Sequence, residues 1–259
     1  MTYEETVEWL FAQLPMYQRI GQSAYKANLN NSIALDEHFG FPHKRFKSVH
    51  VAGTNGKGST SHMLASIFQE AGYKTGLYTS PHLKDYRERI KINGVFIDKE
   101  YVVDFVAQNQ KILNELKPSF FEMSVALAFC YFADNNVDVA IIEVGMGGRL
   151  DSTNIVIPEL AVITNIGWDH MQFLGDSLSK IASEKAGIIK KNIPVVIGEF
   201  HQETIDVFRN QAVTNNAQIH LAFDNYQIEL SKPQNHQKSE IIINGHASGI
   251  RSPSRAMLT

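Results

Sequence analysis

Residues 47–68 have the sequence KSVHVAGTNGKGSTSHMLASIF. The first part, residues 48–52, alternates in polarity as a short strand does. A cluster of glycines around Lys57 follows, and from Ser59 to Ala71 the apolar residues recur at helical spacing. Glycines between a strand and a helix let several backbone N–H groups point inward, and with the helix N-terminus these donors form a cradle for an anion. The stretch therefore predicts a phosphate-binding loop.

The chemistry of such a loop gives roles to its side chains. Lys57 supplies a mobile positive charge for the β- and γ-phosphates of a nucleotide, and a hydroxyl just beyond it, from Ser59 or Thr60, can ligate Mg²⁺. The spacing differs from the standard phosphate loop, because only Thr54 and Asn55 separate the first two glycines and another glycine follows the lysine. The alternative is a glycine-rich turn with a solvated lysine, but the order of strand, turn and helix favours nucleotide binding. The predicted nucleotide-binding residues are Gly53, Thr54, Asn55, Gly56, Lys57, Gly58, Ser59 and Thr60, and Lys57 is also a predicted catalytic residue.

Composition narrows the functional classes. The chain has 259 residues, with 24 lysines and arginines against 27 aspartates and glutamates, and 44% of the residues are hydrophobic. The net charge of −3 offers no electrostatic basis for binding nucleic acid or an anionic membrane surface, and no apolar run approaches the length of a membrane span. Cys130 is the only cysteine, which excludes an internal disulfide, and the acidic N-terminus lacks the basic region of a secretory signal. We therefore expect a cytoplasmic monomer that binds neither nucleic acid nor membrane.

Strand and helix patterns alternate along the chain. Strands are predicted at 48–52, 75–80, 137–145, 159–166 and 193–200, and helices at 2–14, 59–71, 100–116, 120–136, 177–191 and 202–213. The polar segment 81–98 is typical of a long loop with a small hairpin that turns at Asn93-Gly94. This alternation predicts an α/β fold, with a mostly parallel sheet and helices on both faces. We assign residues 1–220 to this domain and residues 221–259 to short strands or a linker.

The loop sequence GTNGKGS (53–59) resembles the phosphate loop of the Mur ligase superfamily, and specifically that of the folylpolyglutamate synthase / dihydrofolate synthase family. Further resembling segments follow in the same order: GLYTSPHL (76–83), ERIKING (88–94), IIEVGMGGRLDSTN (141–154), DH (169–170) before LGDS, and IASEKAGIIK (181–190). The resemblance implies a P-loop NTPase-like Mur ligase central domain that uses ATP and Mg²⁺. It also implies ATP-dependent amide formation between the carboxylate of folate or dihydropteroate and the amino group of L-glutamate.

Several of these segments hold candidate metal ligands. Glu143 ends a buried apolar strand, where an Mg²⁺-binding carboxylate belongs; the alternative is an acid that caps a neighbouring helix. The resemblance makes Glu143 a ligand, together with Ser80 of TSP and His170 of DH, which would otherwise be a turn serine and a structural or surface histidine. Because Mg²⁺ prefers oxygen, His170 would need oxygen ligands around it. The predicted metal set is Ser59, Ser80, Glu143, His170 and Lys185.

Lys185 is also a predicted catalytic residue. The sequence pattern alone is typical of an exposed helix lysine, but in the resembling family the lysine of this segment is carbamylated by CO₂ near the second magnesium ion. An ammonium near Mg²⁺ is repelled, which favours loss of its proton, and the neutral amine can then capture CO₂ to give an anionic oxygen ligand. The resemblance therefore implies a carbamate on Lys185, or an uncharged amine directed at the metal site.

The substrate side of the site follows from the same resemblance. One interpretation of the charged loop 81–98 is a solvated surface loop. The other, which the resemblance implies, is that it covers the pterin substrate as the matching segment of family members does. The family often has Phe-Glu-Phe where this chain has Phe121-Glu122-Met123, so the second aromatic ring for pterin stacking is missing here. The predicted substrate-binding residues are His82, Arg87, Arg89, Phe121, Asp151 and Asn154.

The resemblance stops before the end of the chain. Family members continue into a second α/β domain that helps to bind ATP and glutamate and closes over the site, and Thr259 falls near the point where that domain should begin. The C-terminal ligase domain is therefore expected to be absent, and the chain alone to be nearly inactive. Two other hypotheses remain open: a nucleotide- or folate-binding module without ligase activity, and a Mur-type ligase for cell-wall precursors. The segments TSPHL and IASEKAGIIK favour folate.

Overall fold

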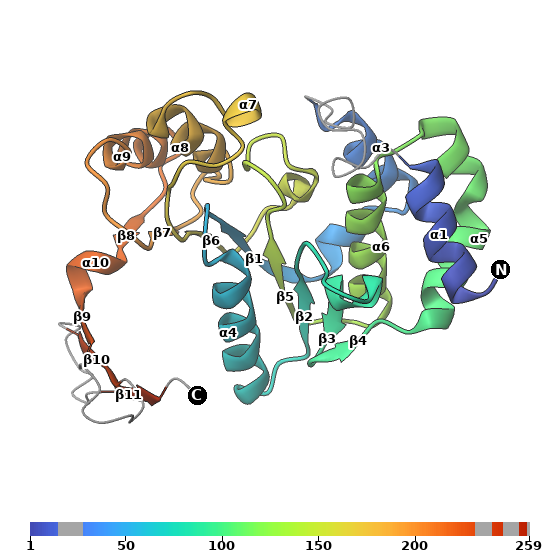
Figure 1. Cartoon of the computed structure of the whole chain (residues 1–259), viewed down its shortest axis with the longest axis horizontal. Coiled ribbons are helices and arrows are strands. Elements are labelled where there is room, and N and C mark those ends of the chain that lie inside the picture. Colours follow the sequence, from blue (N-terminus) through green and yellow to red (C-terminus); the bar gives the residue numbers. More distant parts are fainter. Residues whose placement is uncertain (15–27, 231–239, 246–253, 258–259) are drawn as a thin grey trace.

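The computed structural model describes residues 1–14, 28–230, 240–245 and 254–257. Its centre is an eight-stranded sheet in the order β4-β3-β2-β5-β1-β6-β7-β8 (Figure 1). The strands are β1 (Lys47–Ala52), β2 (Thr75–Tyr78), β3 (Ile90–Ile92), β4 (Val95–Phe96), β5 (Val139–Glu143), β6 (Leu160–Ile163), β7 (Val195–Ile197) and β8 (Ile219–Leu221). All neighbours from β2 to β8 in this order pair in parallel, while β3 pairs antiparallel with both β2 and β4. The predicted mostly parallel sheet is confirmed.

Helices occupy most of the connections between the parallel strands. The described helices are α1 (Tyr3–Gln13), α3 (Asn30–His38), α4 (Lys57–Glu70), α5 (Lys99–Leu116), α6 (Phe120–Asp134), α7 (Met171–Leu174), α8 (Leu178–Ala186), α9 (Ile205–Thr214) and α10 (Ala222–Asn225). Short 3₁₀ turns lie at η2 (Pro42–Arg45), η3 (Tyr86–Arg89) and η4 (Ser152–Ile155). Within the described part of the chain, no helix combines the length and the apolar character that crossing a membrane needs.

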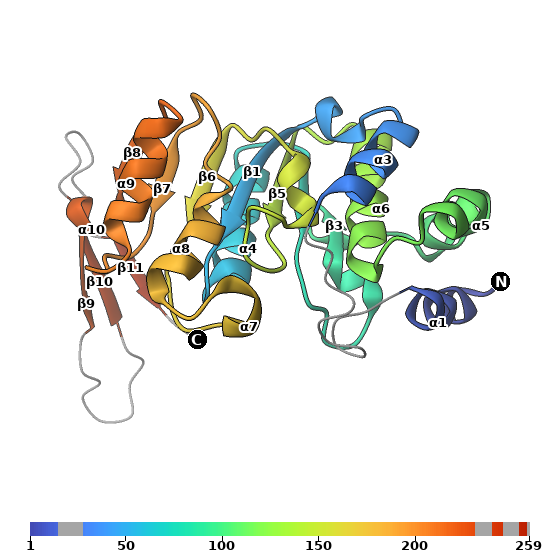
Figure 2. The same ribbon diagram turned by 90° about the horizontal axis from the view of Figure 1, so that it is seen from above.

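The helices cover the two faces of the sheet unequally (Figure 2). On one face α4 packs alone among the described helices, with Ala65 in a cluster that includes Val51 and Ile141 of the central strands. On the other face α6 covers the β2 and β5 side, and α8 with α9 covers the β6 and β7 side. Because β5 is buried on both faces, its sequence VAIIE is apolar until the final glutamate. The prediction of helices on both faces is confirmed.

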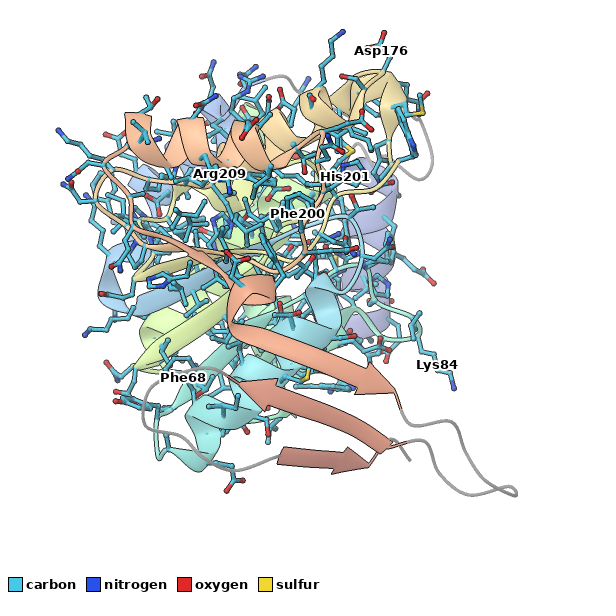
Figure 3. All side chains as sticks on the ribbon, turned by 90° about the vertical axis from the view of Figure 1, so that its left-hand side faces the viewer. Phe68, Lys84, Asp176, Phe200, His201 and Arg209 are labelled. Carbon is cyan, nitrogen blue, oxygen red and sulfur yellow. The ribbon has the colours of Figure 1, made fainter. Side chains whose placement is uncertain are left out.

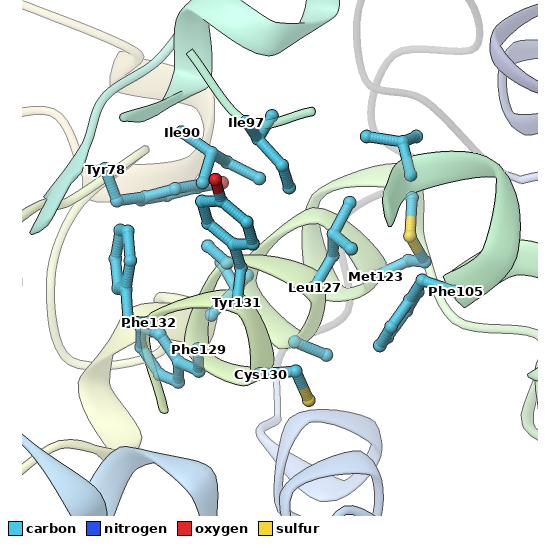
Figure 4. Packing of buried hydrophobic residues seen from close by; sticks show 14 of the residues in the cluster. Tyr78, Ile90, Ile97, Phe105, Met123, Leu127, Phe129, Cys130, Tyr131 and Phe132 are labelled. Atoms are coloured by element: carbon cyan, nitrogen blue, oxygen red, sulfur yellow. The ribbon is translucent and has the colours of Figure 1, made fainter. Parts of the chain in front are cut away.

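α6 is apolar around its whole circumference because it lies between the sheet and the outer helices α3 and α5. Phe129 and Phe132 are almost fully buried, and Figure 4 shows them with Tyr78, Leu127 and Met123 in one packed cluster. Burial of each such side chain stabilises the fold by about 1.5–3 kcal/mol relative to exposure. The helix thereby holds its first residues, Phe120 and Phe121, beside the carboxyl edge of the sheet.

Several elements differ from the sequence prediction. α8 ends at Ala186 rather than at residue 191, and its C-cap Gly187 packs so closely that a Cβ there would lie 2.4 Å from Arg149 Cβ. α3, α7, α10 and β8 were not predicted, and β8 extends the main sheet one residue past the expected boundary at 220. Beyond it, β9 (Tyr226–Leu230), β10 (Glu240–Gly245) and β11 (Ser254–Met257) form an antiparallel sheet. The rest of segment 221–259 lies partly outside the described residues, so the domain boundary stays a prediction.

Candidate active site

The glycine loop, residues 53–58, joins β1 to α4 at the carboxyl edge of the parallel strands. Gly56 has φ 78° and precedes the first residue of α4, and Gly53 has φ 146°, conformations that favour glycine. A Cβ on Gly53 would lie 1.8 Å from Thr164 Oγ1. No side chain in the described part of the chain caps α4, so its first backbone N–H groups remain available to an anion.

The segment after β6 holds this loop in shape. Thr54 N donates to Asn165 O at 3.0 Å, Asn55 N donates to Asn165 Oδ1 at 2.9 Å, and Thr164 Oγ1 donates to Asn55 O at 2.6 Å. Gly167 N donates to Thr54 Oγ1 at 3.0 Å. The loop is therefore preorganised by hydrogen bonds to a neighbouring strand end.

Two lysine side chains converge on one carbonyl oxygen of the loop. Lys57 Nζ donates to Gly53 O at 3.1 Å and to Thr54 O at 3.2 Å, and Lys185 Nζ, from α8, donates to Gly53 O at 2.9 Å. Lys185 is only 2% exposed, so the alternative of an exposed helix lysine is wrong. Burial, and after it the charge of Lys57, lowers the pKa of Lys185 to about 8, while Asp169 acts in the opposite direction. The result is a concentration of positive charge beside the loop.

Glu143 lies next to this charge at the end of β5. The residue is 4% exposed, and its Oε2 accepts a hydrogen bond from Ser80 N at 3.1 Å. A Cβ on Gly58 would lie 3.7 and 3.8 Å from the two carboxylate oxygens, so the carboxylate faces the first turn of α4. Burial raises the pKa of Glu143, and the Ser80 N–H and Lys57 oppose that rise. A buried carboxylate in this position fits a bound cation.

The other predicted metal ligands lie on separate elements. Ser59 is exposed in the first turn of α4, and His170 precedes α7 with φ 43°, its Nε2 3.4 Å from Asp169 Oδ1. Among the residues that the structure describes, no group of three or more His, Cys, Asp or Glu side chains could hold a metal ion. An Mg²⁺ ion beside Glu143 would therefore take other ligands from hydroxyls, water and phosphate oxygens, which suits its preference for oxygen. The predicted ligand set, with Ser80 and Lys185, stays a prediction.

The loop that follows β2 is folded around a single carboxylate. Glu88 accepts hydrogen bonds from the backbone N–H groups of Leu83, Lys84 and Asp85 at 2.7, 2.9 and 2.8 Å. These three bonds hold the pKa of Glu88 down, to about 2. The segment is thus an ordered turn.

His82 and Arg89 are brought together by this turn. Arg89, 4% exposed, donates from Nε to His82 Nδ1 at 2.7 Å, and its guanidinium lies over the ring of Phe120 with Cζ 5.2 Å from the centroid. The His82 ring lies 6.0 Å from that of Phe11 in α1. Burial, followed by the charge of Arg89, lowers the pKa of His82. Because Arg89 occupies Nδ1 as a donor, the neutral ring carries its proton on Nε2.

Arg87 and Phe121 do not join that pair directly. The Arg87 guanidinium binds Asp85 with Nη2 2.7 Å from Oδ2, and it lies over the ring of Tyr3. Phe121 is half-buried and packs so closely on Gly145 that a Cβ there would lie 2.4 Å from its Cζ. Arg87 is therefore neutralised within its own turn, and Phe121 forms a wall beside the loop after β5.

Asp151 makes its hydrogen bonds inside the protein. It is 5% exposed; Oδ2 accepts from Met146 N at 2.9 Å, and Oδ1 accepts from both the backbone N–H and the hydroxyl of Thr153. The Thr153 hydroxyl therefore accepts from His50 Nε2, 2.8 Å away on β1. This buried chain ties the loop to the central strand, so Asp151 has a structural role in addition to any contact with substrate.

Asn154 has a similar internal role. Its Nδ2 donates to the carbonyl oxygens of Arg149 and Gly187 at 3.0 and 3.1 Å, which fastens the loop to the end of α8. Its Oδ1 is buried and has no hydrogen-bond partner among the residues that the structure describes. Substrate contacts by Asn154 and Asp151 stay predictions.

Sequence reasoning missed the segment from Thr164 to Gly167, which braces the glycine loop, and the side chains that α1 adds near His82. The polar TNIG that directly follows β6 was a usable signal, because ligand-binding loops gather at the carboxyl ends of parallel strands. No comparable signal marked Phe11, whose position depends on how α1 packs.

Comparison with known proteins places this geometry in a family. The model of the Mur ligase middle domain matches residues 51–253. A dihydrofolate synthase/folylpolyglutamate synthase of Bacillus subtilis is 42% identical over 217 residues, which is 81% of this chain and 49% of that protein. The crystal structure of folylpolyglutamate synthase from Thermotoga maritima superposes with a TM-score of 0.81 at 34% identity, over 94% of this chain and 55% of that one.

A third match is the E. coli FolC structure in complex with DHPP and ADP, with a TM-score of 0.80, 28% identity and coverage of 95% of this chain and 56% of that one. The chain thus spans about half the length of the relatives it matches. With the glycine loop, Glu143 and Lys185 all inside the matched region, the chain belongs to the folylpolyglutamate synthase family of Mur ligases.

Proposed function

We propose that this chain carries the ATP-binding part of a ligase that joins L-glutamate to the carboxylate of a folate-type substrate. One observation carries the proposal. The amino groups of Lys57 and Lys185 meet at Gly53 O, beside the buried Glu143 and the uncapped start of α4. A triphosphate is the ligand that combines the negative charge and the many acceptor oxygens which this arrangement can satisfy.

At the nucleotide end of the site, positively charged groups screen the negative charge of the phosphates. The N–H groups at the start of α4 and the Lys57 ammonium neutralise the phosphates, so that an anionic carboxylate can approach them. Glu143, Ser59, Ser80 and His170 would hold Mg²⁺, which when bound polarises the phosphate oxygens and balances their charge. Hydrogen bonds with Thr164 and Asn165 fix the backbone of the loop, and the N–H groups at the start of α4 face the phosphates.

The substrate end lies on the other side of Glu143, where the turn after β2 meets the start of α6. Arg89 and His82 offer N–H donors to a carboxylate or carbonyl, and Phe121 offers an apolar wall for a pterin ring. In the first step a substrate carboxylate oxygen attacks the γ-phosphorus and ADP leaves, giving an acyl phosphate. In the second step the glutamate amine attacks the acyl carbon, phosphate leaves, and the amine loses a proton. Water must be excluded while the acyl phosphate exists.

Lys185 has a specific place in this proposal. Its burial and lowered pKa support an amine that loses its proton more readily than an exposed lysine, and a neutral amine can form a carbamate with CO₂. The carbamate would replace a cation beside Lys57 with an anionic oxygen ligand. This assignment is part of the proposal.

The experiment is an assay of phosphate release that depends on both ATP and glutamate. Folate and dihydropteroate are compared with UDP-muramoyl peptides as acceptors. The names of the relatives and the DHPP in the E. coli structure support the folate-type acceptor. We expect the reaction to take place in the cytoplasm. If the chain binds nucleotide but releases phosphate with none of the acceptors, a non-catalytic binding module is favoured. If it releases phosphate only with the muramoyl peptide, a cell-wall ligase is favoured.

A further inference from the structure

Two loops of the proposed site are held in place by different parts of the protein. The segment 164–167, which follows β6, holds the glycine loop. The loop that follows Glu143, residues 144–150, is held by Asp151 instead, because Met146 N donates to Asp151 Oδ2 at 2.9 Å. A change in one set of hydrogen bonds can therefore be made without touching the other.

The loop after Glu143 supports the acceptor end of the site. Gly145 lies directly against the Phe121 ring, so closely that a Cβ there would lie 2.4 Å from Phe121 Cζ. The next N–H along the backbone is that of Met146, which Asp151 binds. The orientation of the Asp151 carboxylate thus fixes the backbone on which the proposed pterin wall rests.

Two buried side chains fix that carboxylate in turn. Thr153 donates to Asp151 Oδ1 from its hydroxyl and, at 3.0 Å, from its backbone N–H, and His50 Nε2 lies 2.8 Å from Thr153 Oγ1. His50 and Thr153 are both 0% exposed, so neither side chain touches a substrate. Any effect that they have on the site must pass through Asp151.

The direction of these hydrogen bonds follows from the carboxylate at one end. An ionised Asp151 only accepts, so the Thr153 hydroxyl donates to it, and the Thr153 oxygen accepts from His50 Nε2. The His50 ring must then carry its proton on Nε2. His50 Nδ1 is buried and has no partner among the residues that the structure describes, which suits a bare lone pair better than an unpaired N–H.

We propose that His50 and Thr153 are positioning residues for the acceptor, because they hold Asp151, and through it the backbone against which Phe121 packs. The inference rests on the proposed function, since it needs a folate-type acceptor beside Phe121. It gives β1 a second task, because the strand that leads into the glycine loop also carries His50, three residues before Gly53. The affinity for nucleotide should not depend on these hydrogen bonds.

The test measures by calorimetry how each variant binds dihydropteroate and Mg-ATP. Thr153→Val keeps the shape of the side chain and removes its hydroxyl. It should weaken dihydropteroate binding about 10- to 100-fold, the range for loss of a side chain that orients a binding residue, and leave the affinity for Mg-ATP unchanged. Thr153→Ser keeps the hydroxyl and should restore most of the affinity. His50→Gln, which keeps an N–H donor, should bind dihydropteroate more tightly than His50→Leu, which has none.

Thr75 provides a matched control. It is 1% exposed, and its hydroxyl donates to Tyr73 O at 3.1 Å at the start of β2, at the edge of the sheet opposite the glycine loop. The Tyr73 ring contacts Phe68, which Figure 3 shows on the far side of the molecule from Asp176, just before α8. Thr75→Val also removes a buried hydroxyl, but it should change neither affinity.

A second measurement needs no variant to fold. Nitrogen NMR of the unaltered protein should show the proton of the His50 ring on Nε2. A proton on Nδ1 would mean that Nε2 accepts from the Thr153 hydroxyl, which could then not donate to Asp151, and the proposal would be overturned.

The binding data separate the remaining outcomes. Unchanged dihydropteroate affinity in Thr153→Val, an equal loss of affinity for both ligands, or a similar loss in Thr75→Val would refute the positioning role, while the proposed function stands. If the unaltered protein binds Mg-ATP but neither dihydropteroate nor folate, the acceptor part of the proposed function fails, and the inference fails with it.

Discussion

Acid should destabilise this protein through His50. The side chain is fully buried in β1 between the two clusters on one face of the sheet, and burial lowers its pKa from 6.5 to about 3. Between these two values the unfolded chain binds a proton that the folded chain does not, so the free energy of unfolding falls as the pH falls. Each pH unit in that window costs about 1.4 kcal/mol. From pH 7 to pH 4 the loss from this one group is about 3 kcal/mol.

Urea unfolding at pH 7, 5 and 4 measures this loss, with His50→Gln as the control. The glutamine retains an N–H donor for the Thr153 hydroxyl but does not titrate, and every other group titrates in both proteins. We expect the natural chain to lose about 3 kcal/mol more than the variant over this range. Parallel stability curves for the two proteins would refute the reasoning, because they would mean that folded His50 takes up a proton as easily as an unfolded one.

Four further predictions concern the site itself. Lys57→Ala should abolish detectable Mg-ATP binding in calorimetry while the domain stays folded, and undiminished binding would remove the glycine loop from the nucleotide site. Glu143→Gln should raise the Mg²⁺ concentration needed for nucleotide binding, so an unchanged Mg²⁺ titration would exclude Glu143 as a ligand. Lys185→Ala should impair the activity of an active ligase, and added short carboxylates should partly restore that activity. The carbamate on Lys185 would be contradicted if mass spectrometry or electron density showed no carbamate and short carboxylates restored no activity. Gly53→Ala should lower stability by about 1–3 kcal/mol in urea unfolding, because its Cβ would meet Thr164 Oγ1 at 1.8 Å and its φ is 146°; an unaltered midpoint would show that the loop tolerates the side chain.

The sheet could be predicted because its strands have patterns that depend on local sequence alone. β5 is an apolar run because it is covered on both faces, and the turn at Asn93-Gly94 has positive φ at both residues, as that dipeptide favours. β8 was not predicted because its three residues, IHL, are only partly buried at the edge of the sheet. A strand of that length has no periodicity to recognise.

The site was less predictable because side-chain contacts depend on packing between distant elements. The burial of Lys185 had a signal in the sequence: Ile181, Ala182 and Ala186 are buried on the same face of α8 at helical spacing, and Lys185 falls among them. No sequence signal indicated the hydrogen bonds that Asp151 makes inside the protein, because they require the loop to fold back toward β1.

The meeting of two ammonium groups at one carbonyl oxygen sets a trade-off between stability and activity. Because Lys57 and Lys185 each donate to Gly53 O, their nitrogen atoms are no more than about 6 Å apart, and the charge of Lys57 adds to burial in lowering the pKa of Lys185. While Lys185 is an unmodified amine, a polyanion at the loop would screen this repulsion, so the closeness of the two positive charges favours anion binding. A substitution that removed one of these charges to stabilise the fold would weaken anion binding at the same time.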